Sequence, residues 1–246
     1  METILITGGT GKLGRLFVEH LFKKNFKIIL TTTSQSNYEE IESKYPSDIV
    51  IPFVIDLCVD DSIHLLSEFL DDGNFRVNHL VNNARSMNYL SLTDNGYSNR
   101  NDFMDEFFLD VVVAHEIAMA LAKYKSLKTI TNISSQYGIV ASNPSLYEPN
   151  QNSSINYNVS KSALIHLTKE LAVRLSSQKI RVNSISYGGV EGRASKEFIS
   201  RYEKISPIAT LLKDHEVAPP LEFLISEGAS AINGHNLIVD NGWTIT

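Results

Sequence analysis

The sequence predicts an α/β protein built on one doubly wound parallel sheet of about seven strands, with helices on both faces. Two observations lead to this fold class. Short apolar segments alternate along the chain with longer segments of helical periodicity, an order typical of parallel sheets. In addition, the first apolar segment, residues 3–7, runs directly into a glycine-rich turn and then into a helical run, as in nucleotide-binding folds.

The expected strands are short apolar runs that end in polar or glycine-rich turns. They cover residues 3–7, 26–31, 49–55, 77–81, 127–133, 180–185 and 237–239. The longest expected helices cover residues 101–124 and the run after Tyr157, where leucine and alanine recur at helical spacing up to Leu175. No internal repeat or linker interrupts this alternation, so residues 1–246 are expected to form a single domain.

The composition excludes several classes of function. A net charge of −6, without a lysine or arginine cluster, argues against nucleic-acid binding. Cys58 is the single cysteine and the seven histidines are scattered, so neither an intrachain disulfide nor a metal site is expected. No apolar run approaches the ~20 residues that span a bilayer, and the amino terminus lacks a signal-peptide pattern. A soluble, cytoplasmic protein without membrane contact is therefore expected.

The glycine-rich turn after the first strand predicts a phosphate-binding loop. Gly8, Gly11 and Gly14 allow a tight turn in which backbone N–H groups approach a pyrophosphate at a helix amino terminus. Thr10, Lys12 and Leu13 lie between these glycines, and we expect them to contact the same cofactor. The alternative is a turn that serves only packing. The position of the glycines within a strand-turn-helix unit disfavours this alternative.

The end of the second strand bears on the choice of cofactor. An acidic residue at this point prefers the free ribose hydroxyl of NAD, but the chain has Thr33 and Ser34 instead. These hydroxyls, together with Lys12, suit a 2′-phosphate and predict NADP. NAD stays possible, because Lys12 can also be read as a solvated residue at the start of a helix.

Tyr157 and Lys161 are separated by one helical turn and should therefore lie on one face of their helix. An ammonium beside a phenol favours the phenolate, and such a tyrosine can exchange a proton with a carbinol oxygen at neutral pH. Taken alone, this spacing also occurs by chance in ordinary surface helices. The motifs before and after it make the catalytic interpretation the better one.

The motifs in their common order resemble the short-chain dehydrogenase/reductase family over essentially the whole chain. They are Thr7 to Gly14, Asn82-Asn83-Ala84, Ser134-Ser135, Tyr157 with Lys161, Ile180-Arg181-Val182-Asn183 and the terminal Ile232 to Gly242. The resemblance implies a Rossmann-type fold and an NAD(P)-dependent oxidoreductase that moves hydride to or from a carbonyl or alcohol carbon.

The resemblance also implies roles for individual residues. Tyr157 would be the acid/base, Lys161 would hold the nicotinamide ribose, and Ser135, three residues before Gly138, would hydrogen-bond the substrate oxygen. The implied cofactor contacts, in addition to Tyr157 and Lys161, are Gly8, Thr10, Gly11, Lys12, Leu13, Gly14, Thr33, Ser34, Asp56, Leu57, Asn82, Asn83, Ala84, Gly188 and Val190.

Four departures from the family pattern stand out. The glycine spacing is similar to that of the family's extended branch, although the chain is too short for that branch's added domain. Arg85 follows Asn-Asn-Ala where glycine is usual, and Tyr187 replaces a proline after the sixth strand. The asparagine expected on the long helix is missing. Asp110 is nearest to its place, and we expect it to complete the catalytic set.

A long segment between Ser135 and Tyr157, together with Arg85, is similar to oxidoreductases that modify sugars of flagellin and surface glycans. A polar substrate, plausibly a sugar or nucleotide sugar, is therefore expected. It would contact Arg85, Gln136 and Tyr147, from substrate loops at 85–100, 139–156 and 188–206. Within these loops, residues 142–156 are expected to form a mobile flap. Arg85 and Arg193 favour an anionic substrate, although solvated loop residues are an equal alternative.

Two other functions stay open at this stage. One is an epimerase or dehydratase that retains its cofactor, and the other is a non-catalytic NADP-binding sensor or partner protein. The long helices at 101–124 and 155–177 resemble those that pair between subunits in the family, so a homotetramer or homodimer is expected.

Overall fold

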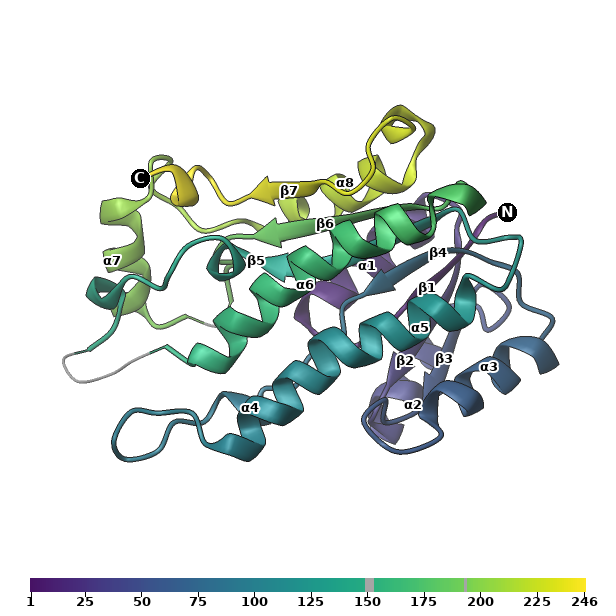
Figure 1. Ribbon diagram of the computed structural model, residues 1–246, viewed down its shortest axis with the longest axis horizontal. Helices are drawn as coiled ribbons and strands as arrows, with labels where there is room; N and C mark the ends of the chain where they lie inside the picture. Colours follow the sequence, from purple (N-terminus) through teal and green to yellow (C-terminus); the bar gives the residue numbers. More distant parts are fainter. Residues whose placement is uncertain (149–152, 193) are drawn as a thin grey trace.

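The computed structural model describes residues 1–148, 153–192 and 194–246, and it confirms the doubly wound parallel sheet (Figure 1). In these residues the sheet has seven strands in the order β3-β2-β1-β4-β5-β6-β7, and all pairings are parallel. The strands are β1 (Thr3–Ile6), β2 (Lys27–Thr32), β3 (Val50–Val54), β4 (Val77–Asn82), β5 (Thr129–Ser135), β6 (Arg181–Tyr187) and β7 (Asn236–Val239).

Helices cover both faces of the sheet. They are α1 (Lys12–Lys23), α2 (Gln35–Lys44), α3 (Ser62–Asp72), α4 (Arg100–Phe107), α5 (Ala114–Leu121), α6 (Ile155–Arg174), α7 (Lys196–Ile205) and α8 (Asp214–Ile225). Side chains of α1, α2 and α8 join the core on one face, and those of α3, α5 and α6 join it on the other. None of the helices in the described part of the chain is long and apolar enough to cross a membrane.

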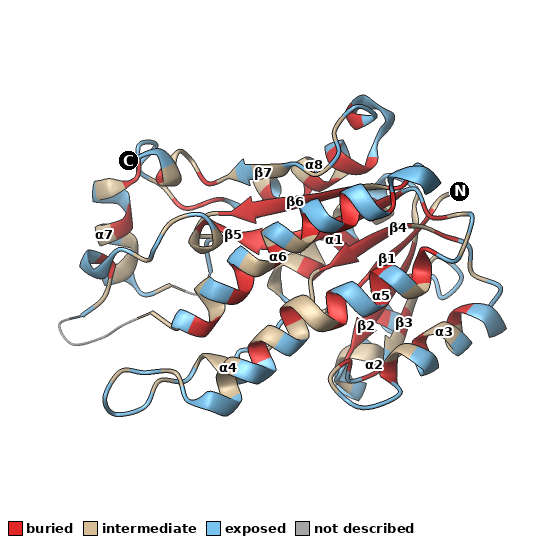
Figure 2. Ribbon diagram, viewed as in Figure 1, coloured by how far each residue is buried: buried red, intermediate tan, exposed pale blue. Residues whose placement is uncertain are grey.

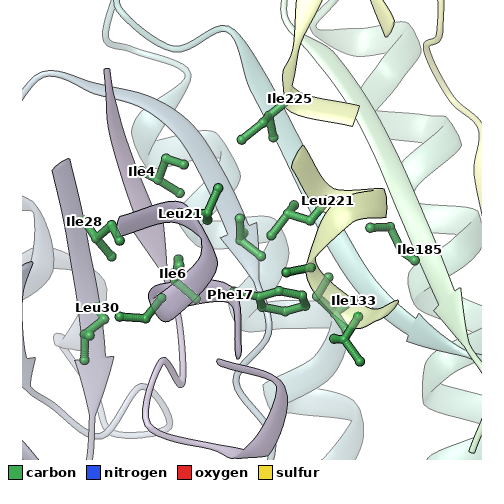
Figure 3. Close-up of a cluster of buried hydrophobic side chains, with 14 of the residues drawn as sticks. Ile4, Ile6, Phe17, Leu21, Ile28, Leu30, Ile133, Ile185, Leu221 and Ile225 are labelled. Atoms are coloured by element: carbon green, nitrogen blue, oxygen red, sulfur yellow. The ribbon is translucent and has the colours of Figure 1, made fainter. Parts of the chain in front are cut away.

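The strands at the centre of the sheet are buried on both sides, as Figure 2 shows. Ile4, Ile6 and Leu30 have no exposed surface, and Phe17 of α1 packs with them and with Leu221 of α8 (Figure 3). Burial on both faces explains why the strands read as continuous apolar runs in the sequence rather than as alternating patterns.

The helix expected over residues 101–124 is wrong in its details. It is divided into α4 and α5 by a π-helical segment, Phe108–Val113, and α5 ends at Leu121. π-Helical segments are rare and often lie at functional sites. Here Asp110, within the segment, binds a buried lysine of α6.

The ends of β1 and β4 are joined by side-chain hydrogen bonds. The Thr7 hydroxyl accepts from the backbone N–H groups of Asn83, at 2.9 Å, and Ala84, at 3.0 Å. The Asn83 amide in turn donates to the carbonyls of Thr7 and Gly8, at 3.0 Å each. β1 lies between β2 and β4, where the strand order reverses, and a crevice opens at such a point in this class of fold.

The expected flap at residues 142–156 is anchored where the structure describes it. Residues 149–152 lie outside the described part of the chain. Pro144–Leu146 form a 3-10 turn, and Leu146 is buried in a cluster with Tyr202 of α7 and Trp243. Because α6 begins at Ile155, Asn156 belongs to the helix and is fully buried. The sequence interpretation missed this apolar anchor.

The close approach of the β1 and β4 ends predicts a specific intolerance at Gly8. Its φ is +62°, and an added Cβ would lie 2.7 Å from the Cα of Ala84. Gly234 has a similar φ of +72°, but its Cβ would meet nothing closer than 3.4 Å. Both alanine variants carry backbone strain, whereas Gly8→Ala adds a clash with backbone that costs about 1–3 kcal/mol more.

Urea unfolding of the two variants without cofactor checks this prediction. We expect Gly8→Ala to be the less stable one by that margin. Equal losses in both variants would show that β4 has room to move away from the turn.

Candidate active site

A cleft of about 680 Å³ opens at the carboxyl edge of the sheet, between the glycine turn and the ends of β2, β4, β5 and β6. It runs from Thr33 and Asp56, after β2 and β3, to Tyr157 and Lys161 of α6 on the opposite side. Most of the expected cofactor residues line it: Gly8, Thr10, Gly11, Lys12, Leu13, Thr33, Asp56, Leu57, Asn83, Ala84, Tyr157, Lys161, Gly188 and Val190.

Three of the expected cofactor residues lie outside the lining of the cleft. Gly14 packs against the turn itself, since an added Cβ would lie 2.5 Å from the Gly8 carbonyl oxygen. The Ser34 hydroxyl caps α2 by accepting from the backbone N–H of Asn37 at 3.3 Å. Asn82 is buried and donates to the side chain of Asn132 at 2.8 Å. These three residues lie behind the lining of the cleft and support the residues that form its surface.

The glycine turn fits a pyrophosphate. Gly11 caps α1 without a side-chain hydrogen bond, so the first N–H groups of the helix are open to an anion in the cleft. Lys12 lines the cleft beside them, and its ammonium lies 2.6 Å from Asp214 at the start of α8. Lys12, which the sequence analysis expected to contact the 2′-phosphate, is therefore paired with a carboxylate of the protein.

A second cation, Arg15, which the sequence analysis missed, lies behind the lining of the cleft and contacts the lining residues Thr10 and Asn37. Its guanidinium donates to the Thr10 carbonyl at 2.8 Å, to the Asn37 side chain at 3.2 Å, and to both oxygens of Glu40. The Thr10 hydroxyl is 3.0 Å from that of Thr32 at the end of β2. Arg15 directly follows Gly14, and that position was the available signal.

Ser135, Tyr157 and Lys161 converge at the other end of the cleft. Ser135 is the last residue of β5, and its hydroxyl accepts from the backbone N–H of Tyr137 at 3.2 Å. The Lys161 ammonium lies 5.7 Å from the centre of the Tyr157 ring and donates to the Ile133 carbonyl at 3.1 Å. The Ser134 hydroxyl ties α6 to β5 by donating to the Lys161 carbonyl at 2.9 Å.

Behind Lys161 lie two buried carboxyl groups. Asp110 accepts from the Lys161 ammonium at 2.9 Å, and only 2% and 6% of the two side chains are exposed. Asp110 is thus placed beside Lys161 but outside the lining of the cleft. Glu106 is 1% exposed, and neither of its carboxyl oxygens has a hydrogen-bond partner within the described residues. Burial, and then repulsion by Asp110, raise the pKa of Glu106 to about 7.

Arg85 lies over the ring of Tyr157. The guanidinium carbon is 4.3 Å from the ring centre, which is within the range of a cation–π contact. Arg85 is exposed, and no carboxylate of the described residues lies within ion-pair distance of it. The glycine that is usual here could not make this contact.

A second pocket, of about 360 Å³, adjoins the cleft at Arg85, Ser135 and Tyr157. Gln136 and Tyr147, which the sequence predicts as substrate contacts, line it together with Asn158, Phe198 and Tyr202. The Tyr202 hydroxyl donates to the side-chain oxygen of Gln136 at 3.2 Å. The sequence analysis missed the aromatic residues of α7, because only the fold brings that helix to the site.

Comparison with known proteins identifies this arrangement. The family model described as enoyl-(acyl carrier protein) reductase matches residues 12–244. The chain belongs to the short-chain dehydrogenase/reductase family. It is therefore an NAD(P)-dependent dehydrogenase or reductase, as the motifs predict, and the cleft described above suits a nicotinamide cofactor in shape and in its open helix terminus.

Individual members of the family show how far the likeness extends. 4-Hydroxyisoleucine dehydrogenase complexed with NADH is 27% identical, with a TM-score of 0.84 and coverage of 100% of both chains. Post-translational flagellin modification protein A of Campylobacter coli is 22% identical over 98% of both chains. An uncharacterized short-chain type dehydrogenase/reductase of Sinorhizobium fredii is 27% identical over 98% of this chain, which spans 43% of that relative.

The pKa of Glu106 predicts how stability depends on pH. The folded-state value of about 7 lies above the ordinary 4.5, so protonated Glu106 stabilises the fold at low pH. That stabilisation is lost as the pH rises through about 7. Glu106→Gln removes the titrating group, and its stability relative to wild type should increase between about pH 5 and pH 9, by on the order of 3 kcal/mol.

Thermal or urea unfolding across this pH range measures the effect. Glu116→Gln, the same substitution at an exposed position of α5, is the control and should follow wild type. A constant difference between Glu106→Gln and wild type at all pH values would contradict the raised pKa.

Proposed function

We propose that the protein transfers hydride between a nicotinamide cofactor and a carbonyl or alcohol carbon of a polar substrate. The observation that carries this proposal is the position of Ser135 and Tyr157 on the wall shared by the cleft and the second pocket. A carbon held between the two cavities can meet a hydride donor on one side and hydroxyl groups on the other.

The residues of the chain would supply the proton transfer and the positioning. The nicotinamide, when bound, supplies or accepts the hydride. Tyr157 would give a proton to the substrate oxygen during reduction and take it back during oxidation. Ser135 would donate a hydrogen bond to the same oxygen, and Lys161 would hold the cofactor ribose beside Tyr157.

We propose that the second pocket holds the substrate, and its lining supports a sugar or nucleotide sugar. Amide and hydroxyl groups of Gln136, Asn158 and Ser153 offer hydrogen bonds, and the rings of Tyr147 and Phe198 offer apolar faces. Such a mixture suits the hydroxyls and the C–H faces of a sugar ring. The likeness to a flagellin modification protein supports the same substrate class.

We propose that the segments at 85–100, 139–156 and 188–206 are the substrate loops, and the lining of this pocket supports the proposal. Each of these ranges contributes described residues to the lining, for example Leu90, Tyr147 and Gly189. Arg85 at the entrance would attract an anionic substituent of the substrate, such as a carboxylate or phosphate.

The role of Tyr157 is tested by Tyr157→Phe, which removes one hydroxyl and leaves the ring in place. Turnover should fall by roughly 10²- to 10⁴-fold, while cofactor affinity stays nearly constant. Nicotinamide absorbance with a panel of sugars, nucleotide sugars and hydroxy acids measures turnover, and fluorescence titration measures affinity. Tyr38→Phe, on the surface of α2, is the matched control. A Tyr157→Phe variant that turns over like wild type would refute the assignment.

We further propose that the protein prefers NADP(H) to NAD(H). No acidic side chain lies among the residues at the end of β2 that line the cleft, which are Thr31, Thr32 and Thr33. Arg15 supports the proposal as a cation beside this strand end, although Glu40 engages it in the structure. A 2′-phosphate could replace the Glu40 carboxylate as the partner of Arg15.

Thr33→Asp tests the cofactor preference. A carboxylate at this position would repel a 2′-phosphate and accept hydrogen bonds from a free ribose diol, so NADPH affinity should fall at least about tenfold relative to NADH. Fluorescence titrations of both cofactors measure the ratio. Ser230→Asp adds the same charge on an exposed turn before β7, outside the cleft, and should leave the ratio unchanged. A wild-type protein that binds NADH as well as NADPH would refute the preference.

We also propose that the protein forms a homo-oligomer, a tetramer or a dimer, through the helices on the front of Figure 1. α4, α5 and α6 expose apolar side chains, among them Met104, Met119 and Val173. Burial of this surface against a second copy would remove it from water.

A further inference from the structure

The charged and titratable groups around Tyr157 come from five parts of the fold. Lys161 lies one turn further along α6, and Arg85 reaches the ring from the segment after β4. Asp110 and Glu106 lie behind Lys161, on the π-helical segment and on α4. Tyr147, from the segment after β5, is a further titratable residue that interacts electrostatically with Tyr157.

The positive charge of Lys161 is already balanced inside the protein. Its ammonium is 2.9 Å from the Asp110 carboxylate, and both groups are buried, so the attraction between them is only weakly screened. The pair has no net charge, so its electrostatic field at the neighbouring phenol is weaker than the field of a lone ammonium would be. Glu106 cannot supply a positive charge, and above about pH 7, where its carboxyl group ionises, it adds a negative charge behind Lys161.

Arg85 is therefore the cation near Tyr157 that has no carboxylate at ion-pair distance in the described residues, although the buried Glu106 interacts with it electrostatically at longer range. Its guanidinium lies over the ring at 4.3 Å, where it attracts the π face of a neutral phenol and attracts a phenolate more strongly. The two unusual residues thus have opposite effects on the same side chain. Asp110 weakens the positive field of Lys161, and Arg85 restores a positive field from the other side.

We propose that Arg85 is a positioning residue that supplies, over the Tyr157 ring, the positive charge that Asp110 balances on Lys161. This inference rests on the proposed role of Tyr157 as the acid/base. It goes beyond that role, because it explains why an aspartate beside the lysine is compatible with a phenolate. It also predicts that Arg85 and Asp110 depend on each other.

The ionisation of Tyr157 can be measured directly, without any substrate. Carbon-13 NMR of labelled tyrosine in the whole protein, with the signal assigned by its loss in Tyr157→Phe, gives the midpoint of the titration. Arg85→Met keeps the length of the side chain but removes its charge, and it should raise the midpoint by roughly 0.5–1 pH unit. Arg85→Lys keeps the charge and should stay close to wild type. Because Arg85 is exposed, both variants should fold.

The partner residue provides the second half of the experiment. Asp110→Asn leaves the Lys161 charge unbalanced and should lower the midpoint, and the Arg85→Met/Asp110→Asn double variant should return it toward wild type. Should Asp110→Asn fail to fold, salt gives an independent test. Raising the ionic strength screens the exposed Arg85 and should raise the wild-type midpoint, with little effect on Arg85→Met.

The proposal is overturned if Arg85→Met leaves the midpoint unchanged, if Arg85→Lys shifts it as far as Arg85→Met, or if folded Asp110→Asn does not lower it. These outcomes are distinguishable from failure of the proposed function. If Arg85→Met does not shift the midpoint, the proposal about Arg85 fails but the acid/base role of Tyr157 stands. If Tyr157→Phe turns over like wild type, the acid/base role fails but the measured effect of Arg85 on the Tyr157 midpoint stands.

Discussion

The hydrogen bonds that join the ends of β1 and β4 set the geometry on which the whole site depends. The Thr7 hydroxyl accepts from two successive backbone N–H groups after β4, and Asn83 returns two hydrogen bonds to the glycine turn. These contacts hold the glycine turn against Asn83 and Ala84, the two residues that precede Arg85. The cleft is therefore formed by rigid strand ends, as a site that must align two reactants requires.

A second constraint is the burial of charge behind the reacting end. A buried lysine is stable as a cation only with a close partner, and Asp110 is that partner. The π-helical segment carries Asp110, and it lies between the regular helices α4 and α5. Local helix geometry, a buried ion pair and the electrostatic environment of Tyr157 are thus parts of one arrangement.

Much of the fold could be predicted from the sequence because its signals are local. Buried strands such as β1 and β5 are short apolar runs bounded by turns, and their observed ends differ from the expected ones by one or two residues. The glycine turn and the spacing of Tyr157 and Lys161 are equally local. These features predicted residues that the structure brings together along one cleft.

The remaining features depend on contacts between residues far apart in the sequence. Lys12 pairs with Asp214, which lies 202 positions away, and Arg15 with Glu40, so neither partner could be read from the glycine motif. The π-helical segment carries Asp110, whose partner Lys161 lies 51 positions further along the chain. Leu146 anchors its segment because Tyr202 and Trp243 meet it in space. A sequence pattern can identify the residues that make such contacts, but it cannot predict which residues pair with each other.

The central claim is that one cleft brings a nicotinamide ring against Tyr157 and Ser135. A crystal structure of the protein with bound NADPH tests it most directly. The account predicts the pyrophosphate at the start of α1, the nicotinamide ribose beside Lys161, and the reactive face of the ring toward the second pocket. A dinucleotide bound elsewhere, or one whose nicotinamide points away from Tyr157, would contradict it.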